Sequence, residues 1–391
     1  MGVVKSRKVS GKAVSSISKA SSGKVSAGDL NSQYTSFTGG NSKAPYILNY
    51  VVVAGGGGGG SGAFNSCTPT CTLVWRCLKS GGGGAGGVLQ GSSAVTGGST
   101  VLITVGAGGG APGGTTAGQN AFNGCNSSLI GGGLSVSAVG GGFGGWGLRH
   151  ATPPNPATAW YGTPGNPGGS GGGAFYAPSL HNCSALGGCG TPGQGNSGGG
   201  RLTTGVGTGG AGGGGAGGAG AGACNTRYAS GGIGVPVTIL GPVPSIPPLS
   251  PLKTPAGYVG GGGGAGGAVG YTLPNNGVGG QGGGGNGAVF ASCQSQWILP
   301  VPNNNGRVST AGGVGTGGGG GNGALPIAPQ FPGPVSYPGP VFGQAGGSGT
   351  VIISAPTALI GTAGPPASFI TGTDGAGNTW IQFTGSGTYT V

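Results

Sequence analysis

The chain has 391 residues, of which 110 are glycine, and only 4% are charged. An ordinary soluble domain has about 25% charged residues. A disordered chain is usually less apolar than this one, whose mean hydropathy is +0.12. The composition therefore excludes a conventional side-chain core throughout the chain and argues against disorder. We expect a folded structure held together largely by hydrogen bonds between backbone groups.

The net charge of +12 is concentrated near the beginning of the sequence. Residues 1–44 contain seven of the 14 Lys and Arg residues and one of the two acidic residues, whereas the rest of the chain is nearly uncharged. We interpret this segment as a basic, serine-rich arm. Its basic residues are Lys5, Arg7, Lys8, Lys12, Lys19, Lys24 and Lys43.

The first residues of the arm suggest two ways of attachment. Gly2, with Ser6 four residues later, fits the N-myristoylation pattern, so Gly2 is a candidate lipidation site, although so short a pattern also arises by chance. An acyl chain beside a basic patch anchors a protein stably to a membrane. The same charges would alternatively neutralise nucleic acid or an acidic partner without sequence specificity. We find no apolar secretion signal and no apolar stretch long enough for a transmembrane helix, so we expect synthesis in the cytoplasm.

From Gly55 onward, glycine-rich stretches alternate with segments that carry side chains. The string GGGGAGG begins at residues 81, 212 and 261, and GGNGA begins at 284 and 320, which indicates a stacked, repetitive architecture. Flexible linkers are one interpretation, but so many linkers would leave little to connect. The alternative is an extended left-handed helix with three residues per turn. Such helices satisfy their outward-pointing backbone groups by packing side by side, and only glycine permits the close approach.

Strand-like segments lie between these stretches. The segment 46–53 predicts a buried strand, and 88–105 predicts a hairpin around Gly97-Gly98. Further short strands are expected at 134–139, 350–354 and 380–383. Three inserts rich in proline are expected to form surface loops, because proline interrupts regular ladders; they span residues 148–182, 235–258 and 325–342.

These patterns together predict a mainly β fold with polyglycine-II-like extended helices. We expect a glycine-rich sandwich framed by short antiparallel strands, with almost no α-helix. The organisation would be an arm (1–44), a glycine-rich scaffold (45–354) and a C-terminal β flank (355–391). If the glycine-rich stretches are interior, a side chain at Gly214 or Gly263 should block assembly, whereas one at Gly257, in an insert, should be tolerated.

The residues needed for catalysis are scarce. The chain has two acids, Asp29 and Asp374, and two histidines, His150 and His181. Acid–base chemistry requires positioned titratable groups, so we expect no enzyme activity, no catalytic residue, no cofactor and no small-molecule substrate.

The eight cysteines leave three interpretations open. Their spacing differs from the tight pairs of a zinc site, so a metal is the least favoured. Local disulfides formed after assembly and buried free thiols are the others. The disulfide candidates are Cys67, Cys71, Cys77, Cys183 and Cys189.

The order of these motifs resembles a known family. Residues 51–60 run from VVVA into glycines, Gly86-Gly87-Val88 follows, and the next segment ends at 103–108 with ITVGAG. This series resembles a glycine-rich domain of bacteriophage tail-fibre and adhesin proteins and of large DNA viruses. Residues 346–353 resemble its closing strand, 383–391 its flanking strand pair, and 34–39 a weaker copy of that flank.

The resemblance covers residues 34–391 and implies a β-rich frame carrying polyglycine helices, with a role in particle structure or host attachment. It implies no catalytic residues. The cysteines and the basic arm depart from the phage members. We therefore expect a virion structural protein, a minor capsid, spike or fibre protein of a large DNA virus. Its expected partners are other virion proteins or copies of itself, with membrane or nucleic acid contacted through residues 1–44.

Two other functions remain open. In a receptor-binding adhesin of the phage tail-fibre type, the proline-rich and aromatic inserts would contact the host. An ice-binding protein would need a flat, regular threonine or alanine face, and the irregular glycine-rich stretches fit that role less well.

Overall fold

The computed structural model divides the chain into two units, Met1–Ala44 and Pro45–Val391. The arm up to residue 43, including the weaker flank copy at 34–39, lies outside the described residues. The structure describes residues 44–64, 80–111, 121–150, 159–175, 186–200, 210–222, 229–239, 257–266, 268–269, 277–288, 290–291, 309–323 and 343–391.

The regular elements in these ranges are all β-strands, as the sequence predicts, and no described helix is long and apolar enough to cross a bilayer. The strands are β1 (Tyr46–Val53), β2 (Gly62–Phe64), β3 (Val88–Val95), β4 (Thr100–Thr104), β5 (Ser127–Gly131), β6 (Leu134–Ala138), β7 (Gly147–His150), β8 (Ala159–Gly162), β9 (Val235–Pro236), β10 (Tyr258–Val259), β11 (Ala268–Val269), β12 (Phe290–Ala291), β13 (Thr350–Pro356), β14 (Thr362–Gly364), β15 (Phe369–Thr373), β16 (Asn378–Phe383) and β17 (Gly387–Thr390).

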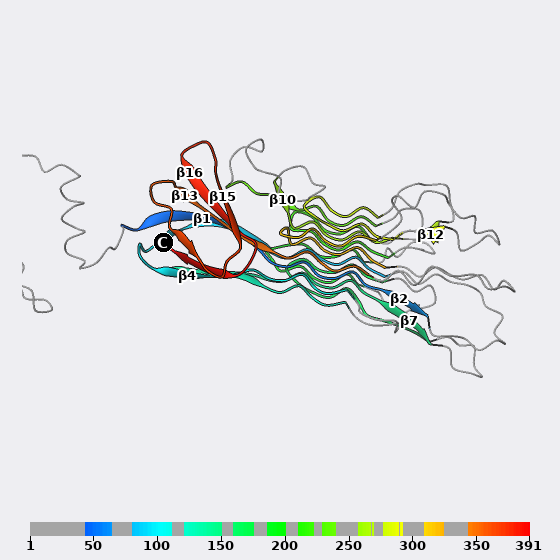
Figure 1. Ribbon diagram of the computed structural model, residues 1–391. Helices are drawn as coiled ribbons and strands as arrows, with labels where there is room; N and C mark the ends of the chain where they lie inside the picture. Colours follow the sequence, from blue (N-terminus) through cyan, green and yellow to red (C-terminus); the bar gives the residue numbers. More distant parts are fainter. Residues whose placement is uncertain are drawn as a thin grey trace, which may run out of the picture. The chain divides into compact units, whose positions relative to one another are not determined.

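Two antiparallel five-stranded sheets form the frame. The first sheet has the order β15-β16-β13-β1-β3, and the second has the order β14-β17-β4-β5-β6. Within the unit Pro45–Val391, these strands lie at one end and the glycine-rich segments extend away from them (Figure 1). Three smaller sheets, β9-β10, β11-β12 and β2-β7-β8, complete the described pairing.

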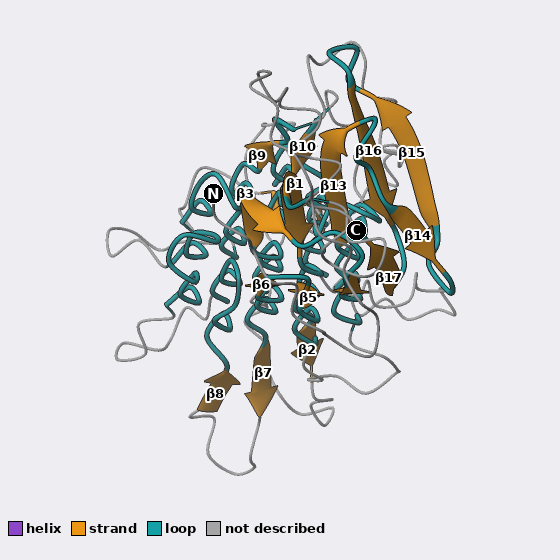
Figure 2. Ribbon diagram, turned by 90° about the vertical axis from the view of Figure 1, so that its left-hand side faces the viewer, coloured by secondary structure: helices purple, strands orange, loops and turns teal. Residues whose placement is uncertain are grey.

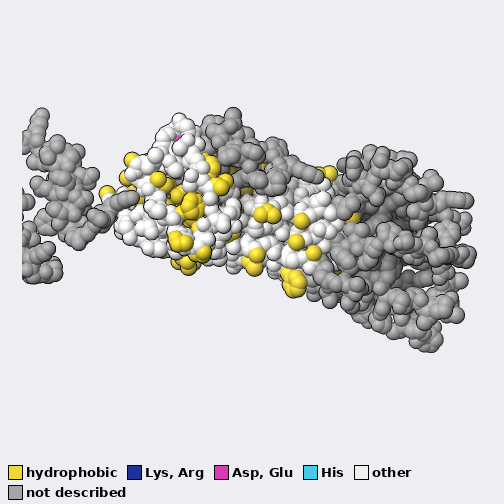
Figure 3. All heavy atoms as spheres, viewed as in Figure 1, with side chains coloured by type: hydrophobic (Ala, Val, Ile, Leu, Met, Phe, Trp, Pro, Cys, Tyr) yellow, Lys and Arg dark blue, Asp and Glu magenta, His cyan; other side chains and the backbone are white. Residues whose placement is uncertain are grey.

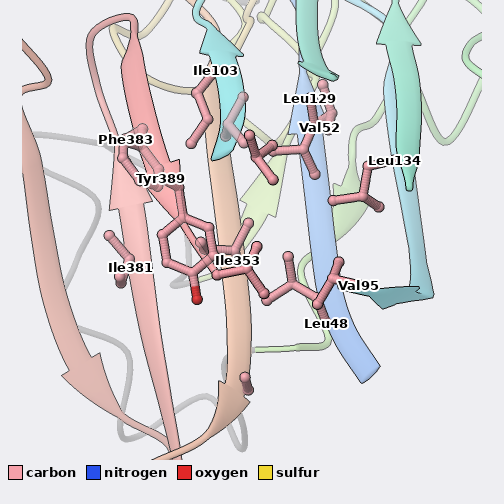
Figure 4. Packing of buried hydrophobic residues seen from close by; sticks show 14 of the residues in the cluster. Leu48, Val52, Val95, Ile103, Leu129, Leu134, Ile353, Ile381, Phe383 and Tyr389 are labelled. Carbon is pink, nitrogen blue, oxygen red and sulfur yellow. The ribbon is translucent and has the colours of Figure 1, made fainter. Parts of the chain in front are cut away.

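The two large sheets pack face to face as a sandwich around a core of aliphatic and aromatic side chains (Figure 4). β1 is the buried strand that the sequence predicts, with Leu48 and Val52 fully buried in this core. At one edge the hydroxyls of Tyr46 and Tyr389 lie 3.1 Å apart. Burial, and then the bond to Tyr389, raise the pKa of the Tyr46 phenol. The phenol therefore stays neutral and can share this hydrogen bond inside the sandwich.

The outer face of the first sheet is covered by its own chain. Val51 and Val53 of β1 point away from the sandwich core and pack with Trp380 in a second apolar cluster. Val237, which follows β9, and Val259 of β10 complete this cluster. The described ends of the insert 235–258 therefore do not form a surface loop. Their alternating valines bury one side, and Pro236 is accommodated in a ladder of only two residue pairs.

The expected hairpin at residues 88–105 is wrong. The strands and the turn are where the sequence places them, but β3 pairs with β1, whereas β4 pairs with β17 and β5. The turn carries the chain from one sheet to the other. Its backbone groups bond to distant residues, since Gly98 donates to the carbonyl of Val391 at 2.9 Å and Thr96 to that of Gly132 at 3.2 Å.

Adjacent residues of β1 offer a test of the sandwich core. Leu48 is fully buried, whereas Ile47 is 54% exposed. We expect Leu48→Ala to lower the free energy of unfolding by about 2–5 kcal/mol, because it removes buried methyl groups and leaves a cavity. Ile47→Ala should stay within about 0.5 kcal/mol of the parent. Denaturant unfolding monitored by tryptophan fluorescence measures both changes, and equal losses would contradict the described orientation of β1.

Candidate functional site: a hydrogen-bonded glycine array

The described glycine-rich segments form eighteen short runs, which together we call the glycine array. In chain order, runs 1 to 18 are residues 54–60, 80–87, 106–111, 121–126, 139–146, 163–166, 168–175, 186–190, 195–200, 210–216, 217–222, 229–234, 260–266, 277–281, 282–288, 309–313, 316–323 and 343–349. Figure 2 looks along the array and shows its segments as narrow coils.

Successive N–H groups of run 1 point in three directions. Gly55 and Gly58 donate to carbonyls of run 4 at 3.0 Å, and Gly56 and Gly59 donate to run 18 at 2.9 and 2.8 Å. Ala54, and each third residue after it, donates to run 2 at 2.8–3.0 Å. A strand would alternate between two sides. The bonding of this run instead repeats every three residues.

The carbonyls of run 1 complete a ring of six neighbours. They accept N–H groups from runs 3, 5 and 17, which alternate with runs 2, 4 and 18 around it. Consecutive members of this ring are also bonded to one another. Run 2 has the same environment: it donates to runs 5, 10 and 17 and accepts from runs 1, 7 and 13. The runs are therefore packed hexagonally.

Six runs are enclosed in this way, and run 2 lies at the centre of the array. The enclosed runs are 1, 2, 7, 10, 13 and 17, and the other twelve form the perimeter. Run 7 (168–175) is enclosed and run 6 (163–166) lies on the perimeter, and both belong to the predicted insert 148–182, so this part of the insert is not a surface loop either. Most glycines of this part are buried because they pack against neighbouring backbones.

Glycine is required because the runs touch through their backbones. A Cβ built on Gly57 would overlap the carbonyl of Gly142, and one on Gly263 would overlap that of Gly320. Gly214 is equally enclosed, as the sequence predicts. Gly257, expected to tolerate a side chain, is buried with a φ of 98°, so a substitution there would be strained as well.

Asparagine side chains replace missing backbone partners. Asn322 is fully buried and its Oδ1 accepts the N–H of Gly266 at 2.7 Å, while its Nδ2 donates to the carbonyl of Ser80 at 2.8 Å. In the other copy of the GGNGA string, Oδ1 of Asn286 accepts the N–H of Gly279 at 2.9 Å. The repeated string thus marks positions where an amide completes the array.

Asparagine side chains also bond to run 5, which lies on the perimeter. Among the described runs, run 5 has one neighbour fewer than an enclosed run. Asn126 and Asn123, three residues apart on run 4, accept the N–H groups of Gly140 and Phe143 at 2.8 and 3.0 Å. The three-residue spacing places both amides on the same side of the run. Sequence analysis does not identify these asparagines, although their spacing carries the signal.

Charge is almost absent from the described surface (Figure 3). Asp374 is the only charged side chain that the structure describes, and it orders the turn between β15 and β16. Its carboxylate accepts the N–H groups of Ala376 at 2.7 Å and Asn378 at 3.0 Å. Hydrogen bonds from Asn378, first that of its side chain, lower the pKa of Asp374. This carboxylate therefore stabilises a turn, and that contribution is lost as the pH falls through the lowered pKa.

Most predicted site residues lie outside the described ranges. This holds for Gly2, for the basic residues of the arm and for Cys67, Cys71, Cys77 and Cys183. Cys189 is exposed, and the structure shows it as a free thiol, as it does Cys125. Within the described ranges, no three His, Cys, Asp or Glu side chains gather as they would to hold a metal ion. The disulfides and the lipidation therefore stay predictions.

No protein-family model, curated protein or solved structure significantly matches the chain. The resemblance to glycine-rich viral and phage domains consequently depends on the motif order alone. A function has to be argued from the array, from the sandwich and from the distribution of charge.

Two adjacent glycines of run 3 test the packing. A Cβ on Gly109 would overlap the carbonyl of Phe122, whereas one on Gly110 would meet only the Phe122 ring, at 3.5 Å. Gly109→Ala should therefore lower the free energy of unfolding by about 1–3 kcal/mol, as overpacking does. Gly110→Ala should be neutral or stabilising by up to about 1 kcal/mol. Thermal and denaturant unfolding measure the difference, and two equally tolerated variants would indicate flexible linkers.

The asparagines provide a second test. Asn322→Ala leaves a buried N–H and a buried carbonyl without this amide, so we expect a loss of about 1–3 kcal/mol for each unsatisfied group. Asn123→Ala is the matched control, because Asn123 is exposed and water can replace its amide. Denaturant unfolding should show a clearly larger loss of unfolding free energy for Asn322→Ala than for Asn123→Ala. Equal losses would contradict the inference that burial makes the Asn322 amide more important.

Proposed function

We propose that this protein is a structural component of a virus particle, in which a bundle of polyglycine II helices acts as a rigid, uncharged body and residues 1–44 attach it. The minor capsid, spike or fibre protein of a large DNA virus is the form of this role that we favour. The observation that carries the proposal is the hexagonal packing of the runs around run 2.

The bonding of the array supports polyglycine II helices. Such a helix has three residues per turn and a rise of about 3.1 Å, with all of its N–H and C=O groups directed outward. The rotation of donors along run 1, and the division of its six neighbours into three acceptors and three donors, are what this geometry requires. A seven-residue run would be about 20 Å long at that rise.

A structural role also agrees with the interior of the array. On every side of an enclosed run lies another run, bonded through backbone groups. Such an interior supplies stiffness, since each run is restrained from six directions, but it offers few side chains for chemistry. The only described carboxylate orders a turn.

Attachment is assigned to the arm because of its charge and its place in the chain. Seven basic residues precede β1, which begins at Tyr46 and lies between β13 and β3 in the first sheet. The sandwich would thus be the end of the body nearest in sequence to the attachment segment. Charge of this kind suits a membrane surface, nucleic acid or an acidic virion protein.

A receptor-binding adhesin of the phage type is the second candidate. The direction of the runs favours this candidate, because the chain leads away from the sandwich in one run and back toward it in the next. Most of the sequence segments between runs therefore start and end at the run ends that lie far from the sandwich (Figure 1). Neutralisation of attachment by antibodies against those segments, in a particle that keeps its composition, would favour this reading over a purely structural one.

Particle association tests the proposed role of the arm. We expect a chain lacking residues 1–44 to fold, as judged by an unchanged thermal midpoint, but to be lost from purified virions. If acylation dominates, Gly2→Ala alone should abolish association even at low salt, and intact mass should show the loss of one acyl chain. If charge dominates, Gly2→Ala should be silent and association should fall steeply with salt. Unchanged incorporation of the truncated chain, in fixed stoichiometry, would refute attachment through the arm.

A further inference from the structure

The two outer faces of the sandwich differ in one respect. β9, β10 and the residues beside them cover the part of the first sheet around Val51, Val53 and Trp380, whereas no described residues cover the outer face of the second sheet in this way. Leu102 of β4 and Ile130 of β5 are 54% and 48% exposed there, and they are direct cross-strand partners. The second sheet therefore presents an apolar pair at its centre that no described part of the chain covers.

Hydroxyl groups surround this apolar pair. In the same row across the sheet, Thr388 pairs with Leu102, and Ser135 pairs with Ile130. The rows on either side carry only small hydroxyl residues at the paired outward positions. These are Thr362, Thr390 and Thr100 in one row, and Thr104, Ser128 and Ser137 in the other. The outer face of the second sheet is thus small, regular and free of charge.

We propose that this face is a contact between two copies of the chain, packed second sheet against second sheet. The face has no charged group with which to select a charged partner, and its pattern is complementary to itself. A twofold axis between Leu102 and Ile130 would place each of them on the other residue of the second copy, with hydroxyl rows facing hydroxyl rows. Twofold contacts are self-complementary in this sense, and an exposed apolar patch with a polar rim is typical of an interaction site.

The size of the face sets the strength of the contact. Five strands spaced about 4.8 Å apart and about five residues long, at about 3.4 Å per residue, present roughly 400 Å² per copy. Two copies would bury roughly 800 Å², below the approximately 1,200–2,000 Å² of a stable complex. The contact is therefore weak between isolated chains and becomes effective when many copies are held together, as on a particle.

Sedimentation velocity of the full chain over a wide concentration range tests the proposal. We expect a reversible dimer at high micromolar concentration, and we expect 1 M NaCl not to weaken it, because an uncharged contact is not screened. Leu102→Glu and Ile130→Glu should each weaken dimerisation at least tenfold. Ile47→Glu is the matched control, being 54% exposed on the outer face of the first sheet, and should leave dimerisation unchanged.

Mixing complementary variants distinguishes the twofold arrangement from a nonspecific loss of dimerisation. Under the twofold axis, Leu102→Glu in one chain faces Ile130→Lys in the other, so the mixture should dimerise where each variant alone does not. A chain that is monomeric at every concentration would overturn the proposal, as would dimers that are abolished by salt or equally weakened by Ile47→Glu. Association that is lost in salt would indicate a charged contact, to which this face contributes no group. A parent chain that stays monomeric but still associates with particles would refute this contact without affecting the proposed function.

Discussion

The structure depends on one constraint: backbone groups without side chains must find their hydrogen-bond partners in other backbones. A net hydrogen bond contributes about 1 kcal/mol, whereas ordering one residue costs about 1–2 kcal/mol. Short glycine runs therefore gain little by themselves. Here β1, β3, β4, β5, β6 and β13 lie next to runs 1, 2, 3, 4, 5 and 18 in the chain, with at most one residue between strand and run. The side-chain core of the sandwich thus fixes the position and register of six runs, and the remaining runs can pack on that template.

The same constraint explains where other residues enter the array. An amide side chain carries the donor and the acceptor of a peptide group, so asparagine can replace a missing backbone neighbour, as Asn322 does in the interior and Asn123 at the perimeter. Alanine enters only where its methyl group has room, and Ala85 and Ala265 are fully buried in enclosed runs. The recurring strings in the sequence thus mark positions where the local packing of the runs admits an asparagine or an alanine.

The sequence predicts the structure correctly where the pattern is local, and it fails where pairing depends on residues far away in the chain. The strand Tyr46–Val53 is apolar enough to be recognised alone, and its bounds are confirmed. The hairpin at 88–105 is wrong because pairing is decided elsewhere: β1 takes β13, some 300 residues later, and β3 as its partners. The order of the runs could not be predicted at all, since glycine-rich stretches are chemically alike. Asn123 and Asn126 are not identified from the sequence, although the three-residue period is predicted, because their role depends on which run packs beside them.

The packing of the array also determines where charge can reside. A Lys or Arg side chain inside an enclosed run would overlap a neighbouring carbonyl and bury a charge without a partner, which is strongly unfavourable. All seven basic residues beyond the arm accordingly fall outside the runs; they are Arg76, Lys79, Arg149, Arg201, Arg227, Lys253 and Arg307. The described runs are therefore uncharged. Electrostatic attachment must then come from segments outside the array, whereas contacts made by the array and by the second sheet must be apolar or hydrogen-bonding contacts.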